Sequence, residues 1–386
     1  MARAVILTLP AIGTIAFSLQ SGGFFAGTPA VAAVVVGVLL VLRITLAEEP
    51  FAAVSRGLCV AVAALGLYTG LVLASGSWSD SPARAMIEFD RALLYWLVLV
   101  LFGSVPWRRS DVAWALRLTV LAIAAVASVA LVSRLFPDVF DVTEEVAINR
   151  LSYPLTYWNT LGLMCALAIV FCLSLTCSSD EPRWGRVAAA TLLPLLAGTL
   201  FFTFSRGAIG AAVVGGVAAL ILAHSRATLG GLIAAGPPVA FTVMSLYGKD
   251  LLSGENPKSA AAAAQGHDAA LVVGLCMLAA GGLRVLLLLL DRRLERSSAQ
   301  AFRWLRPAAA ALAVAGIVVL VATGVPGRLV DTVDDFVQGK ENVTERQDFR
   351  SRLTDPGNNG RIDQWNVALE GFRSEPLVGI GAGKFP

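Results

Sequence analysis

Three arginines stand where the sequence could bind an anion. Arg206 lies in FTFSRGAIG, between two apolar segments and without an acidic neighbour. Arg361 follows the turn-forming run PGNNG, and Arg150 precedes an aromatic cluster in INRLSYPLTYWN. An arginine at a helix start adds its guanidinium donors to the backbone N–H groups of the first turn, which suits a phosphate. Brought together, the three arginines would form a pyrophosphate clamp.

Arg206 and Arg361 also have plainer interpretations. Arg206 could be an interfacial anchor whose guanidinium extends from an apolar helix to water. Arg361 could be a solvated arginine at a helix start, where Asp363 offsets the unfavourable interaction with the helix dipole. The residues alone leave both interpretations open.

The segment after Arg150 is rich in aromatic and hydrogen-bonding side chains. Tyr153, Tyr157 and Trp158 are typical of the aromatic belt at a membrane interface. Asn159 could bind a ligand or cap the helix that follows. Arg150, Tyr153 and Asn159 are therefore candidate substrate-binding residues, and Arg206 and Arg361 are candidate anion-binding residues.

Other reactive residues give no metal or cofactor site. His224 and His267 have no partner at metal-ligand spacing, and the run GIGAGKF has Phe385 where a nucleotide-binding loop needs Ser or Thr. Glu88 with Arg91 at the start of an apolar segment is predicted to be a local i,i+3 pair. The cysteines form no CxxC pair, so they are interpreted as small apolar packing residues: Cys59, Cys165, Cys172, Cys177 and Cys276.

The elements that must hold these residues are apolar helices. Of the 386 residues, 56% are hydrophobic and only 15% are charged, whereas soluble domains carry about 25% charged residues. Apolar runs of about 17–25 residues recur, the length that crosses a bilayer. The sequence predicts an all-α, polytopic transmembrane bundle. The net charge of +3 is spread over loops, so no nucleic-acid partner is expected.

Hydropathy predicts eleven spans: Ala4–Leu19, Pro29–Leu46, Phe51–Ala74, Ala85–Val105, Val112–Phe136, Trp158–Thr176, Val187–Phe204, Gly207–Ala223, Leu229–Leu246, Ala269–Leu290 and Pro307–Val325. Basic residues at 107–109, 183–186 and 291–306 mark cytoplasmic loops and give a cytoplasmic N-terminus. Residues 1–325 would be the transmembrane domain and 326–386 an extracytoplasmic cap segment. The alanine run before Asp268 would form a short surface helix in an outside loop.

The cap segment is expected to contain one amphipathic helix. Ile362, Trp365, Leu369 and Phe372 fall at helical spacing on one face, which predicts packing against protein or the membrane interface. Pro376 would end this helix, and the glycines of GIGAG would give a flexible exit.

The chain resembles the O-antigen ligase and Wzy-type polymerase superfamily. The resemblance lies in three blocks: RLSYPLTYWNTLG (Arg150–Gly162), FTFSRGAIGAAVVG (Phe201–Gly215) and GRIDQWNVALEGFRSEPLVGIGAGKF (Gly360–Phe385). It implies a GT-C-like glycosyltransferase of a bacterial plasma membrane. Such an enzyme takes a glycan from an undecaprenyl-pyrophosphate carrier, on the extracytoplasmic side, and passes it to an acceptor hydroxyl without a metal or cofactor.

The resemblance also assigns roles. Arg206 and Arg361 would neutralise the leaving pyrophosphate, with Arg150 assisting, because fixed donors stabilise charge that develops in the transition state. The family has a histidine just after the G.G.G.F block, and this sequence ends at Pro386, so a C-terminal truncation is expected. Without such a base, a factor of about 10²–10⁴ from general-base catalysis would be lost.

Two other functions are compatible with the residues. A transporter or flippase for a lipid-linked anion would use the same arginines, together with broken spans in matching halves. Pro194 and Gly236–Pro238 are candidate breaks, but no matching halves are found. A non-catalytic membrane scaffold is the third.

Overall fold

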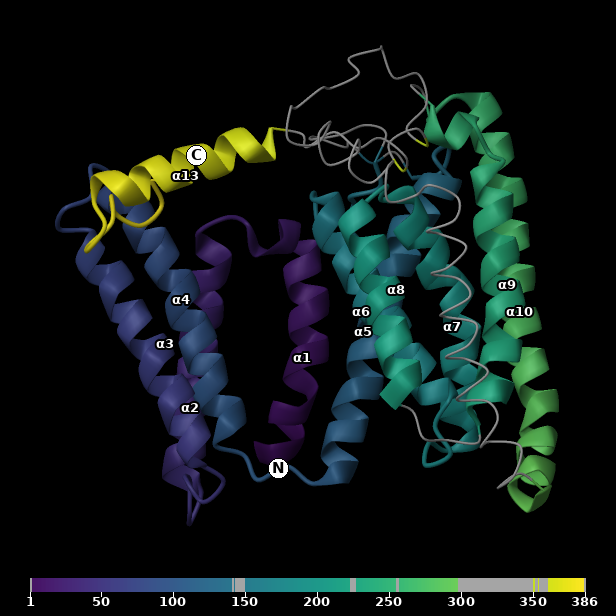
Figure 1. The fold of residues 1–386 in the computed structure, drawn as a ribbon, viewed down its shortest axis with the longest axis horizontal. Helices are drawn as coiled ribbons and strands as arrows, with labels where there is room; N and C mark the ends of the chain where they lie inside the picture. The colour runs from purple at the N-terminus through teal and green to yellow at the C-terminus, as the bar shows by residue number, and fades with distance from the viewer. Residues whose placement is uncertain are drawn as a thin grey trace, which may run out of the picture. The chain divides into compact units, whose positions relative to one another are not determined.

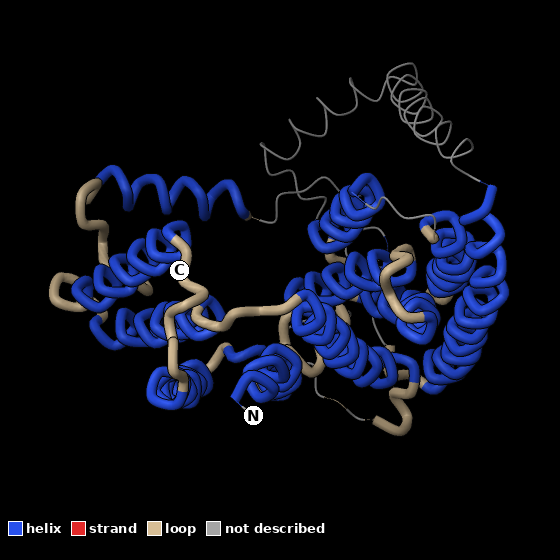
Figure 2. Tube along the Cα trace, turned by 90° about the horizontal axis from the view of Figure 1, so that it is seen from below, coloured by secondary structure: helices blue, strands red, loops and turns tan. Residues whose placement is uncertain are grey.

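The computed structural model describes residues 2–140, 142, 150–222, 227–254, 257–297, 350, 353 and 360–384. Within these ranges the regular secondary structure is entirely helical (Figures 1 and 2). Seven helices are long and apolar enough to cross a membrane. The all-helical fold is therefore confirmed for the described part of the chain, and the seven apolar helices indicate a multi-pass membrane protein.

Ten of the eleven predicted spans coincide with helices. The seven that meet both length and hydropathy are α2 (Gly27–Leu46), α3 (Arg56–Ser75), α5 (Arg109–Leu135), α6 (Trp158–Thr176), α7 (Arg183–Phe202), α9 (Thr228–Tyr247) and α10 (Ala260–Ser297). Helices α1 (Ala2–Leu19) and α8 (Arg206–Leu222) are apolar but shorter, and α4 (Pro82–Gly103) carries four charged residues near its start. The eleventh span, Pro307–Val325, lies outside the described residues.

The chain divides into two compact units. The first contains Met1–Leu118 and Asn358–Pro386, and the second contains Thr119–Gly357. This division differs from the predicted boundary at residue 325, because the C-terminal segment groups with the first four helices.

The first unit has a small apolar core. Ile6, Leu40, Leu101 and Val105 bring α1, α2 and the end of α4 together. The charged start of α4 contains a Glu88–Arg91 ion pair at 2.6 Å, so the predicted i,i+3 pairing is confirmed. Helix α13 (Arg361–Ser374) lies across the ends of α3 and α4 in this unit (Figure 1).

The second unit is built around α7, the most deeply buried of the seven long apolar helices. It packs against α6, α9 and α10, and the hydroxyl of Thr199 donates to the carbonyl of Ala127 in α5 at 3.2 Å. Helix α8 packs on α6 through Ala208, Ala212 and Gly216, spaced four residues apart. Small residues at this spacing let two helix backbones approach closely.

Helix α10 is longer than the predicted span Ala269–Leu290. It begins at Ala260 and continues to Ser297, so the prediction of a separate surface helix in the alanine run is wrong. The side chain of Ser259 caps its start by accepting a hydrogen bond from the N–H of Ala262 at 3.2 Å. The run continues as one helix because alanine has the highest helix propensity and no proline interrupts it.

Candidate functional site

Arg150 is buried against the turn that joins α7 to α8. Its Nε donates to the carbonyl of Thr203 at 3.0 Å, and Nη2 donates to the carbonyl of Phe204 at 2.8 Å. The N–H of the next residue, Leu151, donates to the carbonyl of Phe202 at 2.9 Å. Only 7% of Arg150 is exposed. The guanidinium therefore satisfies carbonyls at the end of α7, which would otherwise lack partners.

Asn159 connects the start of α6 to the start of α8. Its Oδ1 accepts from the hydroxyl of Ser205 at 2.7 Å, and its Nδ2 donates to the hydroxyl of Tyr157 at 2.8 Å. The Ser205 oxygen also accepts from the N–H of Ala208 at 3.4 Å. This is the geometry of a helix cap. Asn159 thus orients the residue that immediately precedes Arg206.

The two segments touch because glycine leaves no side chain between them. A Cβ on Gly162 would lie 2.9 Å from the Cβ of Ala208 and 3.1 Å from Oγ1 of Thr203. Two of the three sequence blocks that carry the resemblance are therefore in direct contact, although they are separated in the sequence. Figure 1 shows the starts of α6 and α8 at one end of the second unit, beside the end of α7.

Arg206 is the first residue of α8 and is half-buried. The N-terminus of a helix presents backbone N–H groups and the positive end of the helix dipole, which together favour an anion. The structure brings the segments of Arg150 and Arg206 together, but the two arginines differ. Arg150 binds the carbonyls of the α7–α8 turn, and Arg206 occupies the first position of α8.

One aromatic ring near Arg150 in the sequence also contacts it in the structure. The Arg150 guanidinium carbon lies 4.3 Å from the centroid of the Trp158 ring, within cation–π distance. The Trp158 ring lies 5.1 Å from that of Tyr157, which is exposed. Tyr153 is half-buried. These contacts explain why the sequence places aromatics around this arginine, and they are compatible with an interfacial belt.

Arg361 belongs to the first unit. It is exposed at the start of α13, directly after Gly360, whose φ of +72° is in the left-handed region. Asp363 lies in the first turn, as expected for a helix start. No residue of α13 is buried, and the side chains on its predicted apolar face are largely exposed. Trp365 is 58% and Phe372 61% exposed, so this face is not buried among the described residues. Its contact with protein or with the membrane interface stays a prediction.

The glycines after α13 do not form a flexible exit. Gly379, Gly381 and Gly383 all have positive φ, and the last two sit where a Cβ would collide with the start of α4 and the turn before it. The glycines are therefore required by close packing of the chain and by a left-handed backbone.

The structure gives His267 a partner that the sequence did not reveal. Its Nε2 lies 3.1 Å from Oδ1 of Asp138, and its ring packs against Phe136 with centroids 5.0 Å apart. Nearby, Nε2 of Gln265 donates to Asp250 at 2.8 Å, and this hydrogen bond lowers the pKa of Asp250. Among the described residues no group of three His, Cys, Asp or Glu could hold a metal ion.

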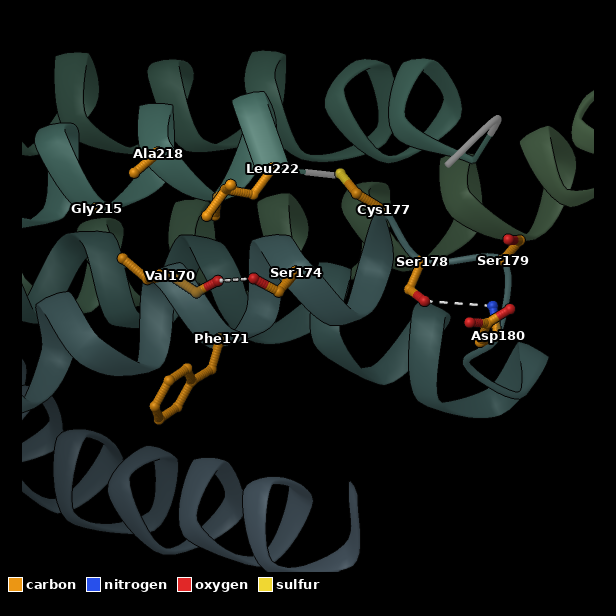
Figure 3. A pocket seen from close by; sticks show the side chains of 11 residues that line it. Val170, Phe171, Ser174, Cys177, Ser178, Ser179, Asp180, Gly215, Ala218 and Leu222 are labelled. Atoms are coloured by element: carbon orange, nitrogen blue, oxygen red, sulfur yellow. Dashed lines mark hydrogen bonds between the residues drawn. The ribbon is translucent and has the colours of Figure 1, made fainter. Parts of the chain in front are cut away.

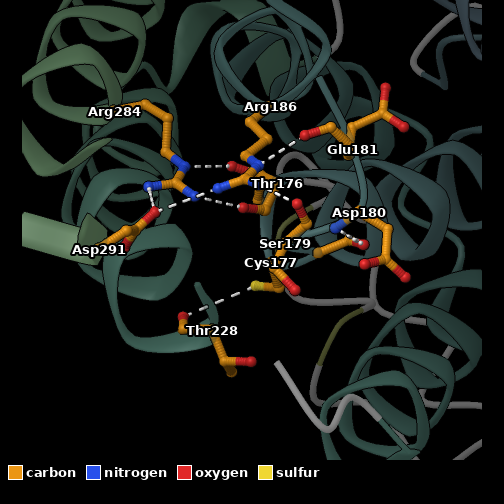
Figure 4. A network of polar contacts seen from close by, with 10 residues as sticks. Thr176, Cys177, Ser179, Asp180, Glu181, Arg186, Thr228, Arg284 and Asp291 are labelled. Atoms are coloured by element: carbon orange, nitrogen blue, oxygen red, sulfur yellow. Dashed lines mark hydrogen bonds and ion pairs between the residues drawn. The ribbon is translucent and has the colours of Figure 1, made fainter. Parts of the chain in front are cut away.

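A buried ionic cluster lies at the C-terminal end of α6, the opposite end of this helix from Asn159. Figure 4 shows its side chains. Arg284 and Arg186 both contact Oδ2 of Asp291, at 2.9 and 3.5 Å. Arg284 also donates to the carbonyl and hydroxyl of Thr176, at 2.8 and 3.1 Å, and Arg186 donates to the carbonyl of Glu181 at 2.8 Å. The arginines therefore cap the C-terminal end of α6 and bind the loop after it, where cations are favoured.

A groove of about 640 Å³ opens between α6 and α8 near that same end (Figure 3). Its polar residues bond locally: Ser174 donates to the carbonyl of Val170, and Ser178 accepts from the N–H of Asp180. The groove is far along α8 from Arg206, which begins that helix. It offers no convergent set of donors for a pyrophosphate.

Comparison with protein-family models, with curated proteins and with solved structures found no match to this chain.

Proposed function

We propose that this protein is a membrane glycosyltransferase of the O-antigen ligase or polysaccharide polymerase type. It would transfer a glycan from an undecaprenyl-pyrophosphate carrier to an acceptor hydroxyl, on the extracytoplasmic side of a bacterial plasma membrane. The observation that carries the proposal is the packing of the Arg150 segment against the start of α8, which fixes Arg206 at a helix N-terminus. The sequence resemblance supplies the substrate class.

Glycan transfer from a pyrophosphate carrier needs positive groups of the kind found at the start of α8. The bond between the anomeric carbon and the phosphate oxygen breaks, and a bond from the anomeric carbon to the acceptor oxygen forms. The acceptor hydroxyl releases its proton to solvent, and undecaprenyl pyrophosphate leaves with additional negative charge. The Arg206 guanidinium and the N–H groups of the first turn of α8 would stabilise that charge as it develops.

Arg150 and Asn159 would act mainly by positioning. Nε and Nη2 of Arg150 donate to the carbonyls of Thr203 and Phe204 in the α7–α8 turn. Asn159 holds the hydroxyl of Ser205, which caps α8. We assign them to the support of Arg206, and Tyr153 to the interfacial wall beside it. Arg361 is the second proposed pyrophosphate ligand, on the strength of its sequence block and its exposed position at the start of α13.

The proposal is tested by transfer activity of the complete natural protein purified in detergent. The donor is a lipid extract containing undecaprenyl-pyrophosphate-linked glycans, and released undecaprenyl pyrophosphate is measured. Replacing Arg206 by alanine should lower kcat by about 10²–10³-fold, the loss typical of a removed oxyanion donor. The matched control is Arg43→Ala, because Arg43 is also half-buried at a helix end but donates to the carbonyl of Ser104 in the first unit.

Equal transfer by the wild type and Arg206→Ala would refute the assignment. The transporter alternative is separated in the same experiment, because transfer in detergent needs no sealed compartment. Substrate movement into sealed vesicles, with no transfer in detergent, would favour the transporter.

A further inference from the structure

The turn between α3 and α4 holds the segment that follows α13. The indole N–H of Trp78 donates to the carbonyl of Gly379 at 3.2 Å, and the N–H of Ala382 donates to the hydroxyl of Ser75 at 3.1 Å. Lys384 forms an ion pair with Asp80. We call residues 379–384 the strap. Its contacts link positions about 300 residues apart in the sequence within the first unit.

The glycines of the strap allow it to pack closely against the α3–α4 turn. A Cβ on Gly381 would lie 2.5 Å from the Cβ of Ser79 and 2.9 Å from its Cα. A Cβ on Gly383 would lie 2.8 Å from the Cβ and 3.0 Å from the carbonyl carbon of Arg84. Real Cβ atoms do not approach backbone so closely, so the strap fits only because both positions are glycine.

The strap is also joined to α13. The N–H of Gly379 donates to the carbonyl of Glu375 at 2.9 Å, and the side chain of Ile380 lies against Gly371 of α13. No residue of α13 is buried, and these two contacts hold the C-terminal side of the helix to the strap.

Arg361 lies at the far end of this helix. A helix of 14 residues is about 21 Å long, so a tilt of about 5° at the strap moves Arg361 by about 2 Å. Displacements of about 1 Å can cost a reaction about 10²-fold in rate. The contact between the strap and the α3–α4 turn therefore controls the position of Arg361, a proposed pyrophosphate ligand.

We infer that Ser75, Trp78 and Asp80 are positioning residues for glycan transfer, because their hold on the strap fixes α13 and Arg361. This inference rests on the proposed function. The three side chains act through the strap and contact no substrate. The glycine pattern in the last sequence block then has a purpose separate from binding: it fits the chain into the α3–α4 turn.

The test exchanges the charges of the ion pair in the complete natural protein. Asp80→Lys and Lys384→Asp should each lower kcat for transfer by about 10–100-fold, while the KM for donor and the melting temperature stay close to the wild type. The double exchange should restore kcat. The matched control is the exposed pair Lys249–Asp268 in the second unit, whose charge exchange should leave transfer unchanged.

A glycine pair tests the steric argument separately. Gly381→Ala and Gly379→Ala both place alanine at a positive φ, but only Gly381 lacks space for a Cβ. Gly381→Ala should therefore reduce kcat at least tenfold more than Gly379→Ala. Equal losses would contradict the close fit.

Measuring Arg361→Ala in the same assay separates the two hypotheses. If Arg361→Ala loses transfer while Asp80→Lys and Gly381→Ala keep wild-type kcat, the positioning inference fails and the proposed function stands. If Arg206→Ala and Arg361→Ala both keep wild-type transfer, the proposed function fails. If the single exchanges lower kcat only together with the melting temperature, and the double exchange restores neither, the contact between the strap and the α3–α4 turn has no specific positioning role.

Discussion

Replacing Asp291 by asparagine removes the carboxylate that Arg186 and Arg284 share. The Arg284 side chain is fully buried, and Asp291 is only 3% exposed. Removing one partner of a buried ion pair leaves an uncompensated charge and costs about 3–5 kcal/mol. Arg284 retains its two hydrogen bonds to Thr176, so we expect a value near 3 kcal/mol. The cluster joins α10 to the end of α6, and this loss should therefore loosen the second unit.

The measurement is the unfolding free energy of the purified protein in detergent, followed by denaturant titration. The matched control is Asp268→Asn, which removes the partner of Lys249 in an exposed pair and should cost about 0–1 kcal/mol. Added salt should not reduce the difference between the variants, because the cluster is buried and weakly screened. Equal stability of Asp291→Asn and Asp268→Asn would refute the view that the cluster holds these helices together.

Two further predictions concern the packing around the candidate site and α10. Gly266→Ala should destabilise the protein by about 1–3 kcal/mol, because the new Cβ would lie 2.2 Å from the carbonyl oxygen of Leu135. Gly274 has open space around it, so Gly274→Ala should be neutral or stabilising by up to about 1 kcal/mol. Denaturant titration of both variants checks this prediction, and equal effects would contradict it. Arg150→Lys should cost about 1.5–3 kcal/mol in the same titration, because a single ammonium cannot replace the two guanidinium donors on the α7–α8 turn; unchanged stability would argue that these contacts are weak.

Much of the fold follows from the sequence because hydropathy dictates it. A run of about 20 apolar residues must form a helix in a bilayer, where every backbone group needs an internal partner. The start of α6 at Trp158 was predicted at the same residue that the structure shows. The alanine run before Asp268 was misplaced because the expected break between a surface helix and a span does not exist.

The surroundings of the candidate residues were less accessible to sequence reasoning. The types of Arg150 and Asn159 indicated hydrogen bonding, but their partners in the α7–α8 turn depend on tertiary packing that spacing cannot show. The pairing of His267 with Asp138 spans 129 residues. One signal was present: Gly162 and Gly266 each mark a close approach of two helices, and glycine inside a helix implies such a reason.

The glycines of the strap were misinterpreted from the sequence. Three glycines in six residues were interpreted as flexibility, yet the same residues are needed where a backbone turns left-handed against a neighbour. The contact with the α3–α4 turn lies about 300 residues away in the sequence. No local sequence pattern around Ser75 or Asp80 predicts this contact.

The most direct test of the proposed function is glycan transfer by the complete natural protein in detergent, with an undecaprenyl-pyrophosphate-linked donor. We predict release of undecaprenyl pyrophosphate together with a gain in acceptor mass, at a rate that falls by about 10²–10³-fold in Arg206→Ala and is unchanged in Arg43→Ala. Transfer by Arg206→Ala at the wild-type rate, or the absence of transfer by folded wild-type protein, would contradict it.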